Sequence, residues 1–302
     1  MEKRDYLVRG MVGEGRARVF AVRTTDIVRE AQRRHGLYPV PSAALGRVLT
    51  IGTILGAMLK GEESVTIQIR GDGPLRSIVA TANSKGQVRG YVGNPHVHLP
   101  LNSKGKLAVG EAVGAGTLFV IRDLGLKETY QGAVPLQTGE IGDDFAYYFA
   151  SSEQTPSAVM LGVLVDPNNV PHAAGGVVIQ LLPGAQDDEV FISKLESAVG
   201  SSPPISSLFA MDKTPEMILD EMFADFDLKI IDRMPVEFAC DCSRERFEAG
   251  LITLGLDELQ ELLDAGENVE TECQFCRSTY YFSIEELQSM IEQIRSDRSD
   301  SQ

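Results

Sequence analysis

The sequence predicts an α+β protein with three parts: a mixed sheet-and-helix core domain in residues 1–186, a helical linker in 187–239, and a small C-terminal domain in 240–302. Three observations support this division. The chain of 302 residues with 43% hydrophobic content is longer than one ordinary core usually covers. Strand-like and helical patterns are mixed throughout the first part. All four cysteines lie in the last part.

The core domain is expected to contain a substantial sheet. Short β-rich runs bounded by turn residues predict strands at 6–9, 17–23, 64–70, 77–81, 87–92, 117–122, 129–134, 157–165 and 175–182. A first helix should span about 25–35 and end at Gly36, a frequent C-terminal residue of helices. A further helix is expected at 139–152.

A long apolar helix is predicted at 42–60. Its most apolar part, 43–59, is shorter than the roughly 20 residues that a membrane span needs, and it contains Arg47. We therefore expect a buried core helix and no membrane association.

The linker is expected to hold a helix that cannot stand alone. Thr214 followed by Pro215 predicts a helix start, an N-cap followed by proline at the first helical position. The helix should place four apolar side chains on one face: Leu219, Met222, Phe223 and Phe226. A helix this short is unstable in water without a partner, so the linker should be metastable. A helix that stays docked permanently fits the same periodicity.

The C-terminal domain is expected to be small and to have a small hydrophobic core. Helices are predicted at 243–254 and 257–265, a strand at 278–282, and a last helix beginning with the capping-box pair Ser283 and Glu286. About 60 residues bury too little surface to be stable without an added crosslink.

The cysteine spacing predicts that crosslink. Cys240 and Cys242 form a CxC pair, and Cys273 and Cys276 form a CxxC pair 30 residues later, which favours a tetrahedral zinc site of four thiolates. Four cysteines without metal would be the simplest alternative. A thioredoxin-like catalyst would need a helix after its CxxC, where a strand is expected here. A purely structural zinc clip also fits the spacing.

The charge distribution argues against nucleic acid as a partner. Residues 240–302 hold 5 Lys and Arg against 15 Asp and Glu, a net charge of −10, whereas phosphate binding depends on basic groups. No hydrolase or nucleotidase motif occurs, so we expect no enzyme activity. No export signal is evident at the N-terminus, so we expect a cytoplasmic protein.

A zinc site built on a CxC pair suggests a switch that responds to oxidation of the cysteines. Adjacent sulfurs around zinc lie about 3.8 Å apart, whereas a disulfide needs about 2.05 Å, so metal and disulfides exclude one another. Oxidation would therefore remove the ligands and unfold the small domain. The helix bearing the linker's apolar face could then undock and bind non-native proteins.

Longer stretches of the chain resemble the redox-regulated 33-kilodalton heat-shock chaperones, which are bacterial holdases. The matching segments are GDGPL at 71–75, YQGAVPL at 130–136, YFASSEQTPS at 148–157, AAGGVVIQLLP at 173–183 and VEFACDCSRERF at 236–247. The resemblance covers essentially the full length.

The resemblance implies an ATP-independent chaperone that is inactive when reduced and bound to one zinc ion. In the family, oxidation under unfolding stress releases zinc and pairs neighbouring cysteines, here Cys240 with Cys242 and Cys273 with Cys276. It also implies binding of unfolded client proteins and a homodimer of the active form. Arg277 departs from the pattern, because family members often carry Gly or Asn there and Gly suits a positive φ. A constitutive, zinc-clipped interaction adaptor is the main alternative; a thiol-disulfide oxidoreductase is the other.

Overall fold

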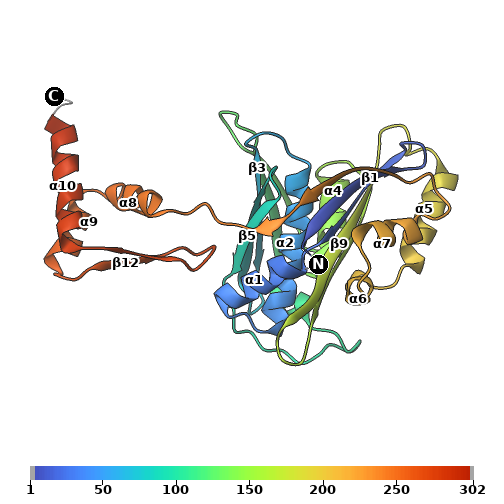
Figure 1. Cartoon of the computed structure of the whole chain (residues 1–302), viewed down its shortest axis with the longest axis horizontal. Helices are drawn as coiled ribbons and strands as arrows, with labels where there is room; N and C mark the ends of the chain where they lie inside the picture. The colour runs from blue at the N-terminus through green and yellow to red at the C-terminus, as the bar shows by residue number, and fades with distance from the viewer. Residues whose placement is uncertain (1–3, 300–302) are drawn as a thin grey trace. The chain divides into compact units, whose positions relative to one another are not determined.

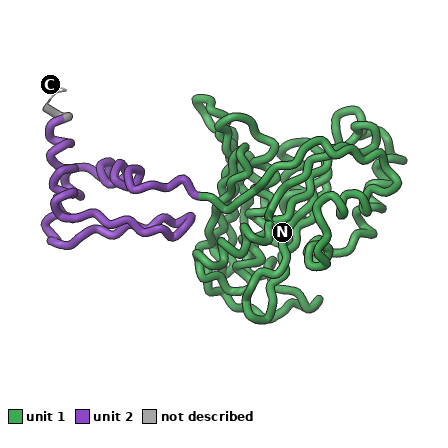
Figure 2. The backbone as a smooth tube through the Cα atoms, viewed as in Figure 1, with its two compact units in different colours: residues 1–239 green, residues 240–302 purple. Residues whose placement is uncertain are grey.

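The computed structural model describes residues 4–299 and divides into two compact units, 1–239 and 240–302 (Figure 2). Three residues at each end of the chain, which fall in the expected core and C-terminal domains, lie outside the described range. The first unit contains two β-sheets and most of the helices, and the second contains a hairpin and three helices. The fold is thus the mixed α+β class that the sequence predicts.

The larger sheet of the first unit has six strands in the order β11-β5-β4-β3-β6-β7. Its strands are β3 (Ser64–Gly71), β4 (Ser77–Asn83), β5 (Gln87–Val92), β6 (Gly116–Asp123), β7 (Tyr130–Pro135) and β11 (Glu237–Phe238). Neighbouring strands are antiparallel except β11, which pairs in parallel with β5. A short helix, α3 (Val109–Val113), precedes β6.

The central helix α2 (Pro39–Ala57) is the core helix that the sequence predicts. It begins three residues earlier than expected because proline is accommodated in the first turn of a helix, where its missing N–H costs nothing. By length and composition it could cross a membrane, but 94% of its apolar window is buried inside the protein. Helices α1 (Thr25–His35) and α4 (Gly142–Ser151) complete this core (Figure 1).

The second sheet of the first unit has five antiparallel strands in the order β10-β1-β2-β9-β8. They are β1 (Tyr6–Val12), β2 (Ala17–Arg23), β8 (Ser157–Val165), β9 (Pro171–Leu181) and β10 (Lys229–Pro235). Both faces are buried. On β2, Phe20 and Val22 face the core around α2, whereas Val19 and Ala21 belong to a separate apolar cluster on the opposite face.

Three helices from the expected linker cover that opposite face (Figure 1). They are α5 (Glu189–Ser201), α6 (Ile205–Ala210) and α7 (Pro215–Met222). The apolar side chains that the strands present to them are Val8, Val12, Ala17, Val19, Ala21, Ala173, Val177 and Ile179. This part of the chain therefore packs as the outer layer of a sheet.

The linker is less helical than the sequence suggests. Residues 229–235 form β10, which pairs with β1 from Met11↔Lys229 to Tyr6↔Pro235, and residues 237–238 form β11. Neither strand was expected. Side chains of β10 are mostly exposed, as expected for an edge strand, so its sequence carries no alternation of apolar and polar residues.

The predicted apolar face of the linker is assembled, although its helix is shorter than expected. Helix α7 ends at Met222, and Phe223 is its C-cap. Leu219 and Phe223 are fully buried, and Met222 and Phe226 are partly buried in the same cluster. The rings of Phe223 and Phe226 meet edge to face with centroids 5.6 Å apart. A turn after α7, not a continued helix, brings Phe226 to this cluster.

The second unit is built around a hairpin and three helices. Its elements are α8 (Arg244–Ile252), α9 (Leu256–Asp264), β12 (Val269–Glu272), β13 (Thr279–Phe282) and α10 (Ile284–Ser299). The predicted capping box is present: Ser283 N–H donates to Glu286, and Glu286 N–H donates to the Ser283 hydroxyl. Among the residues whose burial the structure describes, its apolar core consists of Leu251, Leu259, Phe282, Leu287, Met290 and Ile291, beside the buried Cys273 and Cys276. Six such side chains are a small core for a folded unit.

Candidate metal centre

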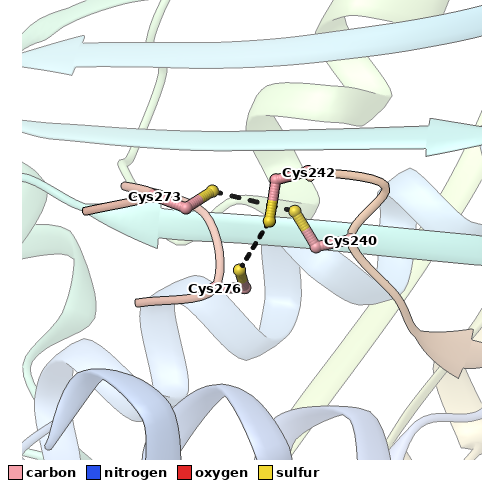
Figure 3. Close-up of side chains that lie close together, drawn as sticks. All are labelled: Cys240, Cys242, Cys273 and Cys276. Carbon is pink, nitrogen blue, oxygen red and sulfur yellow. Dashed lines mark hydrogen bonds between the residues drawn. The ribbon is translucent and has the colours of Figure 1, made fainter. Parts of the chain in front are cut away.

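All four cysteines meet in the second unit. Their Sγ atoms lie within 4.8 Å of one another. Sγ of Cys240 is 3.8 Å from Sγ of Cys273, and Sγ of Cys242 is 3.3 Å from Sγ of Cys276. Figure 3 shows the four sulfurs turned toward one another from two separate backbone segments. The chain therefore offers a four-sulfur cluster positioned to hold a metal ion.

Two local structures present these sulfurs. Cys240 and Cys242 lie in the extended segment just before α8, where the Ser243 hydroxyl accepts a hydrogen bond from a first-turn amide of that helix. Cys273 and Cys276 lie in the turn that joins β12 to β13, and both are buried. The turn is closed by backbone hydrogen bonds from Cys273 N–H to Ser278 O (2.9 Å) and from Arg277 N–H to Cys273 O (2.7 Å).

Arg277 occupies the position where the sequence departs from the resembled family. Its φ is +61°, in the left-handed region that glycine adopts without strain and other residues adopt at a cost. The guanidinium forms a 2.5 Å ion pair with Glu272 at the other end of the turn. The turn thus keeps a glycine-like backbone despite the arginine.

The donor set fits a thiophilic cation. Sulfur ligands around a tetrahedral zinc ion lie about 3.8 Å apart, close to the spacing found here. Burial raises the pKa of the Cys240 thiol to about 12 and also raises the pKa of Cys273. Burial also acts to raise the pKa of Cys276, but hydrogen bonds from the side chain and backbone of Ser278 outweigh it and bring that pKa to about 7. A bound cation would supply the positive charge needed to hold all four sulfurs as thiolates.

The sulfur positions do not select a disulfide pairing. Because each sulfur lies within 4.8 Å of the other three, small movements would allow any pair to form. The pairing of Cys240 with Cys242 and of Cys273 with Cys276 remains an expectation from the family resemblance.

Two hydroxyl groups beside the sulfurs were not predicted. Tyr280 Oη is 3.2 Å from Sγ of Cys242 and donates to the carbonyl oxygen of the same residue, also at 3.2 Å. The Ser278 hydroxyl lies 3.2 Å from Sγ of Cys276. A signal for both existed in the sequence, since strand alternation places Ser278, Tyr280 and the buried Phe282 on one side.

The linker's apolar face belongs to the first unit. Leu219, Met222, Phe223 and Phe226 pack on the sheet that contains β1, β2 and β9, whereas the cysteines lie in the second unit. The structure thus assigns the two predicted groups of residues to different compact units.

Comparisons with known proteins agree over nearly the whole chain. The family model described as Hsp33 protein matches residues 5–283. The 33 kDa chaperonin of Geobacillus kaustophilus is 49% identical over 287 residues, covering 95% of this chain and 97% of the relative. That of Bacillus subtilis strain 168 is 49% identical over 290 residues, covering 96% and 99%. The crystal structure of the 33 kDa chaperonin (heat shock protein 33 homologue) from Thermotoga maritima matches with a TM-score of 0.89 and 36% identity, covering 97% of this chain and all of that one.

Proposed function

Because the chain belongs to the Hsp33 family, whose curated members are named 33 kDa chaperonins, we propose that it is a redox-regulated, ATP-independent holdase chaperone. Its reduced, metal-bound form is inactive, and oxidation exposes apolar surface that binds unfolding proteins. The observation that carries the proposal is the four-sulfur cluster in a unit where the described residues contribute six other buried apolar side chains to the core.

Zinc is the proposed ion. Four thiolates in tetrahedral spacing are the usual ligands of a structural zinc site. Bound there, zinc would crosslink the segment before α8, through Cys240 and Cys242, to the β12–β13 turn, through Cys273 and Cys276. A thioredoxin-like catalyst fits less well because a strand, β13, follows the CxxC pair. An unmetallated cluster fits less well because all four cysteines, in two closely spaced pairs, bring their Sγ atoms within 4.8 Å of one another.

Oxidation of the thiolates dismantles this crosslink. Two thiolates and one molecule of hydrogen peroxide give one disulfide and two hydroxide ions, so two peroxides convert all four sulfurs. Each disulfide brings its sulfurs to about 2.05 Å and removes two ligands. We propose the pairs Cys240–Cys242 and Cys273–Cys276, as the resemblance to the Hsp33 family implies.

Loss of the crosslink should unfold the second unit. Structural zinc sites contribute roughly 10–16 kcal/mol of apparent binding energy, whereas whole domains are stable by only about 5–15 kcal/mol. The small core around Leu251, Leu259 and Phe282 cannot replace that contribution. The second unit is thus the proposed redox-switch domain.

The metastable linker, residues 187–239, is proposed to respond to this unfolding. Its last residue, Ala239, directly precedes Cys240 and donates a hydrogen bond to Val88 O beside β11. When order is lost from Cys240 onward, β11 should fray, and the segment that precedes it should be held less firmly. Helices α5–α7 can then leave the sheet, which exposes their own apolar face and that of β1, β2 and β9.

This newly exposed surface is the proposed binding site for unfolded clients. Contiguous apolar surface of this kind binds other non-native chains or a second copy of the same protein. We therefore propose unfolded proteins as partners and a homodimer for the activated form. Residues 240–302 carry a net charge of −10, so nucleic acid is not a proposed partner. We propose a cytoplasmic location because thiols stay reduced there.

One oxidation time course tests the proposal. Purified protein loaded with zinc is treated with hydrogen peroxide at elevated temperature, and zinc release and suppression of client aggregation are followed together. We expect about one zinc per chain to be released as suppression appears, and both changes to reverse after reduction and addition of zinc. Equal suppression before and after oxidation would instead indicate a constitutive adaptor. Repeated turnover of a model disulfide would indicate an oxidoreductase.

A further inference from the structure

We propose that Tyr280 is a positioning residue that hydrogen-bonds the Cys242 thiolate and slows its oxidation. This inference rests on the redox switch proposed above and assigns a role to a side chain beside it. Tyr280 Oη lies 3.2 Å from Sγ of Cys242 and 3.2 Å from its carbonyl oxygen, so one hydroxyl proton can reach either acceptor. Ionisation of the thiol makes sulfur the stronger acceptor, because hydrogen bonds to a charged group are the stronger ones.

The ring of Tyr280 is held in place by its surroundings. It packs against the ring of Phe247 of α8, with centroids 4.9 Å apart and the ring planes inclined at 31°. Tyr280 lies on β13, after the CxxC pair, whereas Cys242 belongs to the CxC pair before α8. The hydroxyl therefore joins the two backbone segments that supply the sulfurs. The neighbouring Tyr281 is on the other side of the strand and is 61% exposed.

The chemistry of thiolates explains the expected effect. In the first step, the Cys242 thiolate attacks one oxygen of hydrogen peroxide, the O–O bond breaks, and sulfenic acid and hydroxide form. A neighbouring thiolate then attacks the sulfenic sulfur and displaces a second hydroxide, which completes the disulfide. A hydrogen bond to the Cys242 thiolate stabilises the reactant charge that is lost in the first step, so it reduces the nucleophilicity of that sulfur.

Ser278 offers the same arrangement on the other pair. Its hydroxyl lies 3.2 Å from Sγ of Cys276. Each cysteine pair thus has one sulfur beside a hydroxyl group, that of Tyr280 on β13 or that of Ser278 just before it. The mechanism predicts two separate effects, one for each hydroxyl.

Tyr280→Phe tests the proposal, with Tyr281→Phe as the matched control. Tyr280→Phe deletes one hydroxyl and keeps the ring on Phe247, and Tyr281→Phe makes the same change on the exposed side of the strand. Zinc-loaded proteins are exposed to a thiol-alkylating reagent for increasing times, and mass spectrometry of peptides gives a rate for each cysteine. We expect Cys242 to react about fivefold faster in Tyr280→Phe, the change that corresponds to one net hydrogen bond of about 1 kcal/mol.

A spectroscopic measurement separates this role from a merely structural one. Cobalt(II) in place of zinc gives sulfur-to-metal charge-transfer bands, and a thiolate that loses a hydrogen bond donates charge at lower energy. We expect Tyr280→Phe to move these bands to longer wavelength and Tyr281→Phe to leave them unchanged. An unaltered Cys242 rate, or an equal increase at all four cysteines, would overturn the proposal.

If Tyr280→Phe does not bind metal, Ser278→Ala tests whether a hydroxyl group slows the reaction of the neighbouring sulfur. It should accelerate alkylation of Cys276 without accelerating that of Cys242, and no change at Cys276 would refute the hydroxyl mechanism. These outcomes are distinct from failure of the proposed function, which would be seen as wild-type protein that gains no holdase activity on oxidation. Conversely, a holdase with normal switching but unchanged Cys242 reactivity in Tyr280→Phe would overturn only the inference about Tyr280.

Discussion

The Tyr6 hydroxyl donates a 2.7 Å hydrogen bond to Glu216 Oε2 and so connects β1 to the first turn of α7. The other carboxylate oxygen of Glu216 accepts a 2.6 Å hydrogen bond from Arg233 of β10. One carboxylate on the outer helical layer is thus held by two strands of the sheet beneath it. Because the apolar contacts of α7 are non-directional, these polar contacts fix its position on the sheet.

Removing the Tyr6 hydroxyl should make activation easier. Tyr6→Phe keeps the ring and leaves Glu216 with one partner fewer, at a cost of about 1 kcal/mol to the docked state. We expect holdase activity to appear at a lower temperature under the same peroxide treatment. Tyr147→Phe, a similar change at an exposed tyrosine of α4, should not shift the activation temperature. An unchanged temperature in Tyr6→Phe would show that this contact does not restrain α7.

Acid should weaken the docking of α7. Burial acts to raise the pKa of Glu216, but hydrogen bonds from Tyr6 and Arg233 outweigh it and hold that pKa below its ordinary value of 4.5. The folded state therefore binds this proton less tightly than the unfolded state, so its stabilising contribution is present above about pH 4.5 and is lost as the pH falls below it.

Tryptophan fluorescence can follow this pH dependence. The chain has no tryptophan, so Phe226→Trp would introduce the sole indole, placed in the cluster beneath α7. As denaturant is added, the indole emission should shift to longer wavelength. We expect this shift to need a lower denaturant concentration at pH 4 than at pH 6. Adding Glu216→Gln should reduce the difference between the denaturant concentrations needed at pH 4 and at pH 6. If that difference persists in full, other titratable groups cause it.

Phe223→Ser should give a chaperone that needs little or no oxidant. The side chain is 1% exposed and packs on the sheet beside Phe226. Truncating a buried phenylalanine typically costs about 3–5 kcal/mol, which would undock this layer if it is metastable as proposed. Aggregation suppression by the reduced protein is the measurement. Met217→Ser, on the same helix at a residue 46% exposed, is the control and should stay oxidant-dependent; oxidant dependence retained by Phe223→Ser would contradict the linker proposal.

Arg277→Gly should make the metal site harder to oxidise. A non-glycine residue at φ +61° is strained by roughly 1–2 kcal/mol, and glycine would relieve that strain. We expect slower zinc release at a fixed peroxide concentration. Glu272→Gln, which removes only the ion pair to Arg277, serves as the control and should release zinc at the wild-type rate or faster. Faster release from Arg277→Gly would show that the arginine supports the turn.

The fold was predictable where a strand or helix carries its own pattern. Strands β3 to β9 show β-rich runs bounded by turn residues, and most of their observed ends fall within two residues of the expected ones. Strand β10 was missed because its edge position leaves Ile231 60% exposed and imposes no alternation. Its partner, β1, lies at the other end of the first unit's sequence, and no local signal reveals so distant a pairing.

The four sulfurs of the candidate site were predictable, whereas for the hydroxyl groups around them the sequence offered only the strand alternation. Cysteine is rare in this chain and its close spacing is informative by itself, so Cys240, Cys242, Cys273 and Cys276 stood out. Tyrosine and serine are common in strands, and their roles depend on which face of β13 meets the sulfurs. That face is set by the register of the β12–β13 hairpin, a tertiary property.

The helices that cover the sheet are anchored to it at both ends. Strand β9 ends at Leu181, strand β10 begins at Lys229, and both belong to the same sheet. If α5–α7 lift away while these strands stay paired, residues 182–228 become a loop that is tethered to the sheet at both ends. A bound polypeptide would then be kept close to the sheet. The helices could also redock quickly, because a tethered loop experiences a high effective concentration of the sheet face on which it packs.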